Sequence, residues 1–245
     1  LCRLFGKKNI NLINSSKKNL IKLKNDGFIK LDNVVDINLI SEIRKEIKKI
    51  EKKKNLKKTL FIDCNVDDLV AIKKKISLLI NEKLQSILED YYGSGFLVSS
   101  ISHRHTFALP KFKNNELISD FWHCDSSPNS LLQVFILFKD VDKNCGPFQV
   151  IRKKKSQKIV RNGYNRVNRE IKSLDLKNDV FSFTGKAGSV MITNTAECLH
   201  RATFPEKKGD REMMYVHVLP SLRKTKLNEI ESSWIFKYTH PPKNN

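Results

Sequence analysis

Two histidines and one aspartate supply the residue types that can hold a catalytic metal ion. His123 and Asp125 are separated by one residue, and His200 follows Asp125 by seventy-five residues. Side chains two apart on an extended strand point to the same side, so His123 and Asp125 can reach one metal ion. His200 must then arrive from another strand. Two imidazoles and one carboxylate can bind one face of a non-haem Fe(II) and leave the other positions open for a cosubstrate and O2.

Arg211 follows His200 by eleven residues and begins an apolar segment that reads as a strand. A guanidinium group presents a rigid fork of donors that matches a carboxylate. We therefore expect Arg211 to hold the distal carboxylate of 2-oxoglutarate. Gln133 and Thr193 are further candidates for contacts with the cosubstrate or with the metal ligands. Three residues share the face of Arg211 and are expected to line the pocket: Met213, Tyr215 and His217.

His103 and His105 form a rival pair, since both lie on one face of a predicted strand. No suitably placed glutamate follows them, so a metal role is not favoured. We expect these two histidines to serve the substrate pocket or packing.

Several stretches around these residues occur in a recognisable order. They are Phe-Trp-His-Cys-Asp at 121–125 and the segments 25–29, 134–148, 186–192, 198–202 and 209–211. Together they resemble the phytanoyl-CoA dioxygenase family of Fe(II)/2-oxoglutarate-dependent oxygenases, over about residues 20–220. The resemblance implies Fe(II) on His123, Asp125 and His200, and 2-oxoglutarate on Arg211. It implies hydroxylation of a small molecule by O2 with release of succinate and CO2. Related halogenases lack the carboxylate, so Asp125 favours hydroxylation or desaturation over halogenation.

A basic segment at residues 152–179 departs from that resemblance. Where the family usually continues with Pro-Gly-Ser-His, this chain has Arg-Lys-Lys-Lys-Ser at 152–156. We expect a long loop, which is either a solvated charged segment or a lid that grips an anionic substrate. The second interpretation favours a phosphorylated, nucleotide-linked or acyl-thioester small molecule as the substrate.

The whole chain is strongly basic, with 46 basic and 26 acidic residues and a formal net charge of +20. Abundant lysine, asparagine and isoleucine is also what an AT-rich genome produces, so the charge alone does not establish a nucleic-acid partner. A nucleic-acid-modifying AlkB-like oxygenase is one alternative, but the second arginine of those enzymes has no counterpart at short spacing after Arg211. A basic, non-catalytic binding protein on the same fold is another, and the intact ligand set argues against it.

The cysteines and the hydropathy indicate the compartment. Five scattered cysteines without a Cys-x-x-Cys pair favour the reducing cytoplasm over a disulfide framework. Apolar runs are shorter than the roughly 18 residues that a membrane span needs. The N-terminus is broken by charged residues and does not read as a signal peptide.

Hydrophobic periodicity divides the chain into helices followed by strands. Residues 1–19 are polar and expected to be poorly ordered. Helices are predicted at 20–25, 37–53 and 67–92, the second with Ile40, Ile43, Ile47 and Ile50 on one face. Strands are predicted at 28–31, 97–108, 131–138, 148–151, 180–183, 189–193 and 212–219.

This order predicts a mainly β protein with flanking helices. The expected fold is a double-stranded β-helix (jelly roll, cupin-like) braced by N-terminal helices. We expect one domain over 1–245, with a helical flank at 1–95, the β core at 96–222 and a C-terminal tail at 223–245.

Overall fold

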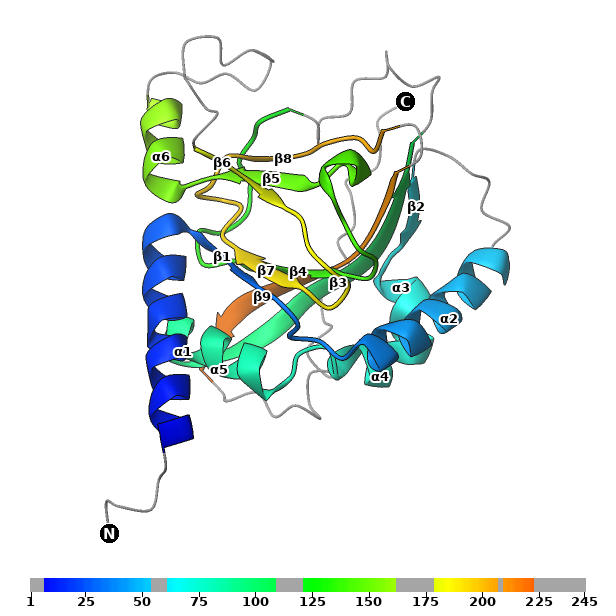
Figure 1. Cartoon of the computed structure of the whole chain (residues 1–245), viewed down its shortest axis with the longest axis horizontal. Helices are drawn as coiled ribbons and strands as arrows, with labels where there is room; N and C mark the ends of the chain where they lie inside the picture. The colour runs from blue at the N-terminus through cyan, green and yellow to red at the C-terminus, as the bar shows by residue number, and fades with distance from the viewer. Residues whose placement is uncertain (1–6, 54–60, 109–120, 162–178, 207–208, 223–245) are drawn as a thin grey trace.

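The computed structural model describes residues 7–53, 61–108, 121–161, 179–206 and 209–222. Its strands pair in two antiparallel sheets (Figure 1). The strands are β1 (Phe28–Leu31), β2 (Phe61–Cys64), β3 (Gly95–Phe107), β4 (Leu132–Leu137), β5 (Phe148–Ile151), β6 (Val180–Phe183), β7 (Val190–Thr193), β8 (His200–Ala202) and β9 (Asp210–Ser221). The large sheet has the order β1-β7-β4-β9-β3-β2, and the small sheet has the order β6-β5-β8.

Helices flank these sheets, mostly from the N-terminal part of the chain (Figure 1). The helices are α1 (Lys7–Asp26), α2 (Ile37–Lys53), α3 (Val66–Leu69), η1 (Val70–Ile72), α4 (Lys73–Ser77), α5 (Glu82–Tyr92), η3 (Lys143–Cys145) and α6 (Lys153–Arg161). Within the described ranges, none of them has the length and apolar character needed to cross a membrane. The mainly β architecture with flanking helices confirms the coarse fold class expected from the sequence.

The large sheet is covered on both faces, which explains why every residue of β4 is buried. Val134 and Ile136 pack in the core that the N-terminal helices share with one face. Phe135 and Leu137 point the other way, into a second core shared with the small sheet. There Phe135 lies 4.6 Å from Phe148 of β5, measured between ring centroids. We call the space between the two sheets the barrel interior.

Strong periodicity predicted several elements correctly. Helix α2 has the predicted bounds, and its Ile40, Ile43 and Ile47 are buried against the sheet. Strands β1, β5 and β6 also begin and end where expected. Strand β2 was not predicted, and β8 was expected only as the strand that carries His200, without bounds. The N-terminal flank at 1–95 is therefore not purely helical. It supplies both edge strands of the large sheet, β1 and β2.

The prediction that residues 1–19 are poorly ordered was wrong from residue 7 onward, where α1 begins. This helix packs against α5, β1 and α6, and its Leu23 is 1% exposed. Tertiary packing thus stabilises a helix whose polar sequence gave only a weak signal.

The loop predicted at 152–179 was also wrong in its first third, which forms α6. Ser156 and Ile159 are its buried residues, and the remaining positions are mainly lysine and arginine. The Ser156 hydroxyl donates to the Ile151 carbonyl at 3.0 Å and accepts from the Leu199 amide at 2.9 Å. Two inward residues one turn apart suffice to seat the helix, but they are too few to produce a visible hydrophobic stripe. Residues 162–178 and the tail at 223–245 lie outside the described residues.

The long helix predicted at 67–92 is interrupted before α5, where Asn81 acts as the N-cap. Its side-chain oxygen accepts from the Leu84 amide at 3.1 Å, and its amide donates to the Val34 carbonyl at 2.7 Å. Asn81→Ala should lower the free energy of unfolding by about 1–2 kcal/mol, because it removes the cap and leaves a carbonyl unpaired. Urea titration of this variant beside Asn81→Asp, which keeps only the cap, measures the two contributions. Unchanged stability in Asn81→Ala would contradict this account.

Candidate metal centre

The backbone brings His123 and His200 together as an isolated antiparallel bridge. The His123 amide donates to the His200 carbonyl at 3.0 Å, and the His200 amide donates back at 2.9 Å. The strand predicted for the His-x-Asp pair is therefore only a single bridge. Asp125 is held separately, since its amide donates to the Thr195 carbonyl at 3.0 Å.

The three side chains converge at the barrel interior. Asp125 Oδ1 lies 3.7 Å from His123 Nε2 and 3.6 Å from His200 Nε2. One ligand atom from each residue lies within 4.8 Å of the other two, a spacing that can hold a metal ion. Both histidines are buried, at 8% and 5% exposure. Phe148 stacks on His200 at 5.4 Å, a contact that the sequence gave no reason to expect.

The two imidazoles are oriented in the same way. His123 Nδ1 lies 2.7 Å from the Phe121 carbonyl, and His200 Nδ1 lies 3.0 Å from the Cys198 carbonyl. In each case the partner is the carbonyl two residues earlier. A carbonyl only accepts, so Nδ1 carries a hydrogen, and in the neutral imidazole Nε2 has the lone pair that a metal needs. Both Nε2 atoms face Asp125.

Asp125 is ionised in this setting. Burial raises the pKa of its carboxyl, but the hydrogen bond and the positive charge that His200 offers when protonated, with a smaller attraction to protonated His123, outweigh burial and hold the pKa well below its usual range. Gln133 donates from Nε2 to Asp125 Oδ2 at 2.8 Å, which leaves Oδ1 directed at the histidines.

Gln133 is the middle of a row of three residues across the large sheet. It lies directly opposite Thr193 of β7 on one side and His217 of β9 on the other. The Thr193 hydroxyl is buried and has no hydrogen-bond partner among the described residues. Burial lowers the pKa of His217, and the charge of Asp125 partly opposes that shift. The row therefore lies next to Asp125, which its middle residue, Gln133, contacts directly.

Arg211 lies further along β9 and is only 2% exposed. Its Nη1 donates to the Thr203 carbonyl at 3.0 Å, whereas its buried Nε has no hydrogen-bond partner in the described part of the chain. Burial lowers the pKa of the guanidinium, and Tyr215 partly offsets this. The same part of the chain pairs no carboxylate with Arg211. Met213 and Tyr215, which follow on the same face of β9, pack in the barrel-interior core, Tyr215 against Phe135.

Arg104 is a further cation at this interior that the sequence did not single out. It lies opposite Met213 in the β3–β9 ladder and therefore on the interior face. Asp63 of β2 accepts from its Nε at 2.6 Å and its Nη2 at 2.9 Å. Burial opposes the charge of Arg104, but these hydrogen bonds outweigh burial and raise its pKa.

His103 and His105, which were expected to serve the substrate pocket or packing, lie on the face of β3 turned away from the barrel interior. Alternation along β3 turns His103 to the helix-covered face, where it is 0% exposed and lies 5.5 Å from the ring of Phe138. His105 contacts Asp210 at 2.7 Å. The packing role expected as the alternative is what the structure has for His103.

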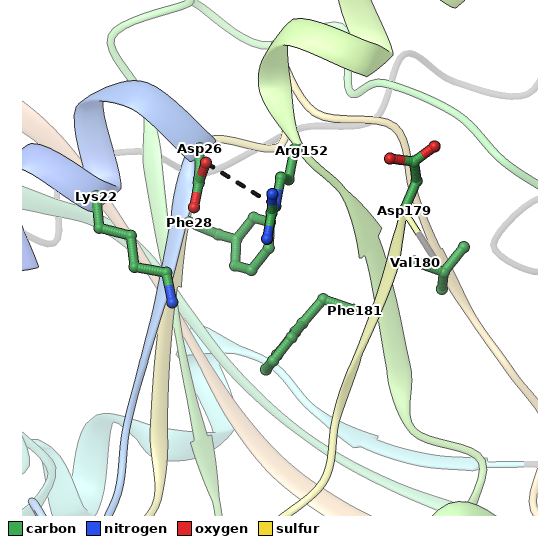
Figure 2. Close-up of a pocket in the computed structure, with 7 residues that line it drawn as sticks. All are labelled: Lys22, Asp26, Phe28, Arg152, Asp179, Val180 and Phe181. Atoms are coloured by element: carbon green, nitrogen blue, oxygen red, sulfur yellow. Dashed lines mark ion pairs between the residues drawn. The ribbon is translucent and has the colours of Figure 1, made fainter. Parts of the chain in front are cut away.

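The basic segment is neutralised in part by carboxylates distant in sequence. Lys153 pairs with Glu197 at 2.7 Å, and Lys155 pairs with Asp179 at 2.9 Å. Arg152 approaches Asp26 at 4.0 Å (Figure 2). These pairs attach α6 to its neighbours.

Figure 2 shows a pocket of about 110 Å³ between α1, β1 and β6. The rings of Phe28 and Phe181 lie 5.1 Å apart on its wall. None of the candidate metal ligands lines it, so this hollow is separate from the metal centre. Its lining residues are Lys22, Asp26, Phe28, Arg152, Asp179, Val180 and Phe181.

No family model matches this chain, and no curated protein matches it either. Solved structures do match. The non-heme alpha ketoglutarate dependent epimerase SnoN from nogalamycin biosynthesis superposes with a TM-score of 0.63 and 12% identity, over 85% of this chain and 84% of SnoN. EctD from S. alaskensis, with bound Fe, has a TM-score of 0.59 and 14% identity over 83% and 76%.

HygX from Streptomyces hygroscopicus, with nickel and 2-oxoglutarate bound, has a TM-score of 0.56 and 12% identity over 85% of this chain and 88% of HygX. At such low identity, the likeness to these three proteins establishes a shared fold.

Proposed function

We propose that this protein is an Fe(II)/2-oxoglutarate-dependent oxygenase that hydroxylates a small molecule. The observation that carries the proposal is the convergence of His123, Asp125 and His200, whose ligand atoms lie within 4.8 Å of one another. The fold supports it, because SnoN is named as alpha ketoglutarate dependent and the HygX structure contains 2-oxoglutarate. We assign the β core at 96–222 to a double-stranded β-helix of the phytanoyl-CoA dioxygenase type, within a single domain.

The donor set fits Fe(II). Two neutral imidazoles with their lone pairs on Nε2 and one ionised carboxylate make a two-histidine, one-carboxylate face. The carbonyls of Phe121 and Cys198 and the amide of Gln133 orient these three ligands from behind. Iron and 2-oxoglutarate, when bound, supply the oxidation of a substrate C–H bond by O2.

Arg211 fits the distal carboxylate of 2-oxoglutarate. A buried guanidinium without a carboxylate is costly, and an incoming carboxylate that accepts from its Nε would remove that cost. Thr193 is proposed as a second donor to the cosubstrate, because its buried hydroxyl lacks a partner in the described chain. Gln133 is better placed to position Asp125 than to bind the cosubstrate.

The experiment that tests this function is optical. Fe(II) and 2-oxoglutarate added anaerobically to the metal-free protein should produce a weak visible metal-to-ligand band that neither produces alone. Admission of O2 should then release succinate. A folded protein that takes up iron without forming the band would refute the 2-oxoglutarate assignment, and a failure to take up iron would refute the metal assignment.

An anionic substrate is the more specific proposal. Lys153 and Lys155 of α6 are paired with carboxylates, and so is the preceding Arg152. Among the described residues, the cations of α6 that have no carboxylate partner are the exposed Lys154, Lys158 and Arg161. Once a substrate is found, Lys154→Gln combined with Lys158→Gln should raise its KM about 2- to 5-fold at low salt and less at high salt. An unchanged KM at both salt concentrations would remove the reason for preferring an anion.

A further inference from the structure

A second group of metal-ligating side chains lies on the opposite face of the large sheet, where α2 packs against the edge strand β2 (Figure 1). Glu51 of α2, Cys64 of β2 and His103 of β3 each offer one ligand atom within 4.8 Å of the other two. Cys64 and His103 are directly opposite in the β2–β3 ladder, and both are 0% exposed. Glu51 is half-buried. None of these residues takes part in the centre described above.

The ring of His103 is held by a carboxylate on its far side. His103 Nε2 lies 3.2 Å from Glu212 Oε1, and Arg44 donates from Nε to Glu212 Oε2 at 2.9 Å. Arg44 also reaches Glu212 Oε2 through Nη2 at 2.6 Å, so a guanidinium as well as the imidazole holds Glu212 as a carboxylate. An ionised carboxylate only accepts hydrogen bonds, so the hydrogen of His103 sits on Nε2.

The other ring nitrogen, Nδ1, is therefore the one with a lone pair in the neutral imidazole. It is buried and has no hydrogen-bond partner among the described residues. Buried polar atoms are almost always satisfied, so an orphaned acceptor here requires an explanation. An imidazole that donates one N–H to a carboxylate and presents its other nitrogen is the usual arrangement of a metal-bound histidine.

We propose that Glu51, Cys64 and His103 form a second metal site, selective for a zinc-class divalent cation. A thiolate, an imidazole and a carboxylate are all zinc ligands, and the thiolate distinguishes this site from the all-nitrogen-and-oxygen iron centre. Binding would replace the thiol proton of Cys64, which is released to solvent. The three donor atoms now lie within 4.8 Å of one another. On one tetrahedral zinc ion they would lie about 3.5 Å apart, and a movement of the half-buried Glu51 side chain would bring its carboxylate closer. The ion would join the end of α2 to the β2–β3 edge.

Cobalt(II) provides the test, because a thiolate bound to it gives a near-ultraviolet charge-transfer band that histidine and carboxylate ligands do not. Metal-free His200→Ala protein, which lacks the iron centre, should bind one equivalent of cobalt and show the band, and zinc should displace it. Cys64→Ser in this background should lose the band. Cys124→Ser, beside His123, should keep it.

Glu51→Gln carries the test if Cys64→Ser does not fold, since Glu51 is half-buried at the end of a helix. It should weaken cobalt binding roughly tenfold or more. Glu46→Gln on the same helix, whose partner is Lys49, is the matched control and should leave the affinity unchanged. A band that persists in Cys64→Ser, or no band in His200→Ala, would overturn the proposal without affecting the iron assignment.

Discussion

Asp125→Ala should lower the rate of succinate formation from 2-oxoglutarate by at least about 100-fold. Groups that merely orient a metal ligand already contribute 10- to 100-fold, so removal of the ligand itself should cost no less. Asp125 is also the only anion of the triad, and it lies 3.7 Å from one imidazole and 3.6 Å from the other. Without it, two neutral imidazoles alone would hold the iron. The iron content after dialysis and the rate of succinate release measure this effect.

Asp140→Ala is the matched control, because this carboxylate is exposed at the surface and pairs with Lys186 at 2.7 Å. It should leave both the iron content and the turnover unchanged. Near-wild-type turnover in Asp125→Ala, with the iron retained, would rule out the proposed triad.

Arg211→Leu should raise the KM for 2-oxoglutarate by roughly 30-fold or more, because the loss of one partner of a buried charged pair costs about 2–5 kcal/mol. The same change should not lower the free energy of unfolding. In the absence of cosubstrate, Arg211 is a buried cation with an orphaned Nε, and its replacement by an apolar side chain removes that unfavourable burial. Opposite effects on KM and on stability separate cosubstrate binding from a structural role.

Arg211→Lys is the informative companion variant. It keeps the charge but not the planar fork, so it should recover only part of the affinity for 2-oxoglutarate. Steady-state kinetics at varied 2-oxoglutarate and urea titration of each variant supply the two measurements. A stable protein with unchanged KM in Arg211→Leu would refute the cosubstrate role, and a destabilised one with unchanged KM would make Arg211 structural.

The predictable parts of the fold were those whose pattern repeats locally. The isoleucines at 40, 43 and 47 predicted α2 with its correct bounds, because a helix buries one face at three- and four-residue spacing. Helix α6 was not predicted, because its buried face consists of only Ser156 and Ile159. The hydrogen bonds that hold it in place join the Ser156 hydroxyl to the backbone of Ile151 and Leu199.

The candidate site was predictable for a different reason. The residue types, the strand spacing of His123 and Asp125, and the order of these two with His200 and Arg211, which resembles a known family, predicted a metal and a carboxylate partner. Strand alternation also indicated that every second residue of β9 from Arg211 to His217 would share a face, because the side-chain period of a strand is two.

Only the tertiary structure determined which groups form hydrogen bonds and ion pairs with the functional side chains. Carbonyls of Phe121 and Cys198 select the imidazole tautomers, and Glu197, Asp179 and Asp26 pair with the cations at 152–155. Likewise, the helix-side face of β3 brings His103 to Cys64 and Glu51. Sequence thus determined the chemical types and local periods, which depend on neighbours along the chain. The tautomers depend on carbonyls two residues earlier, which the local backbone conformation aims at the rings. Charge pairing and the contacts across each sheet face depend on residues far apart in sequence, and only the fold brings those together.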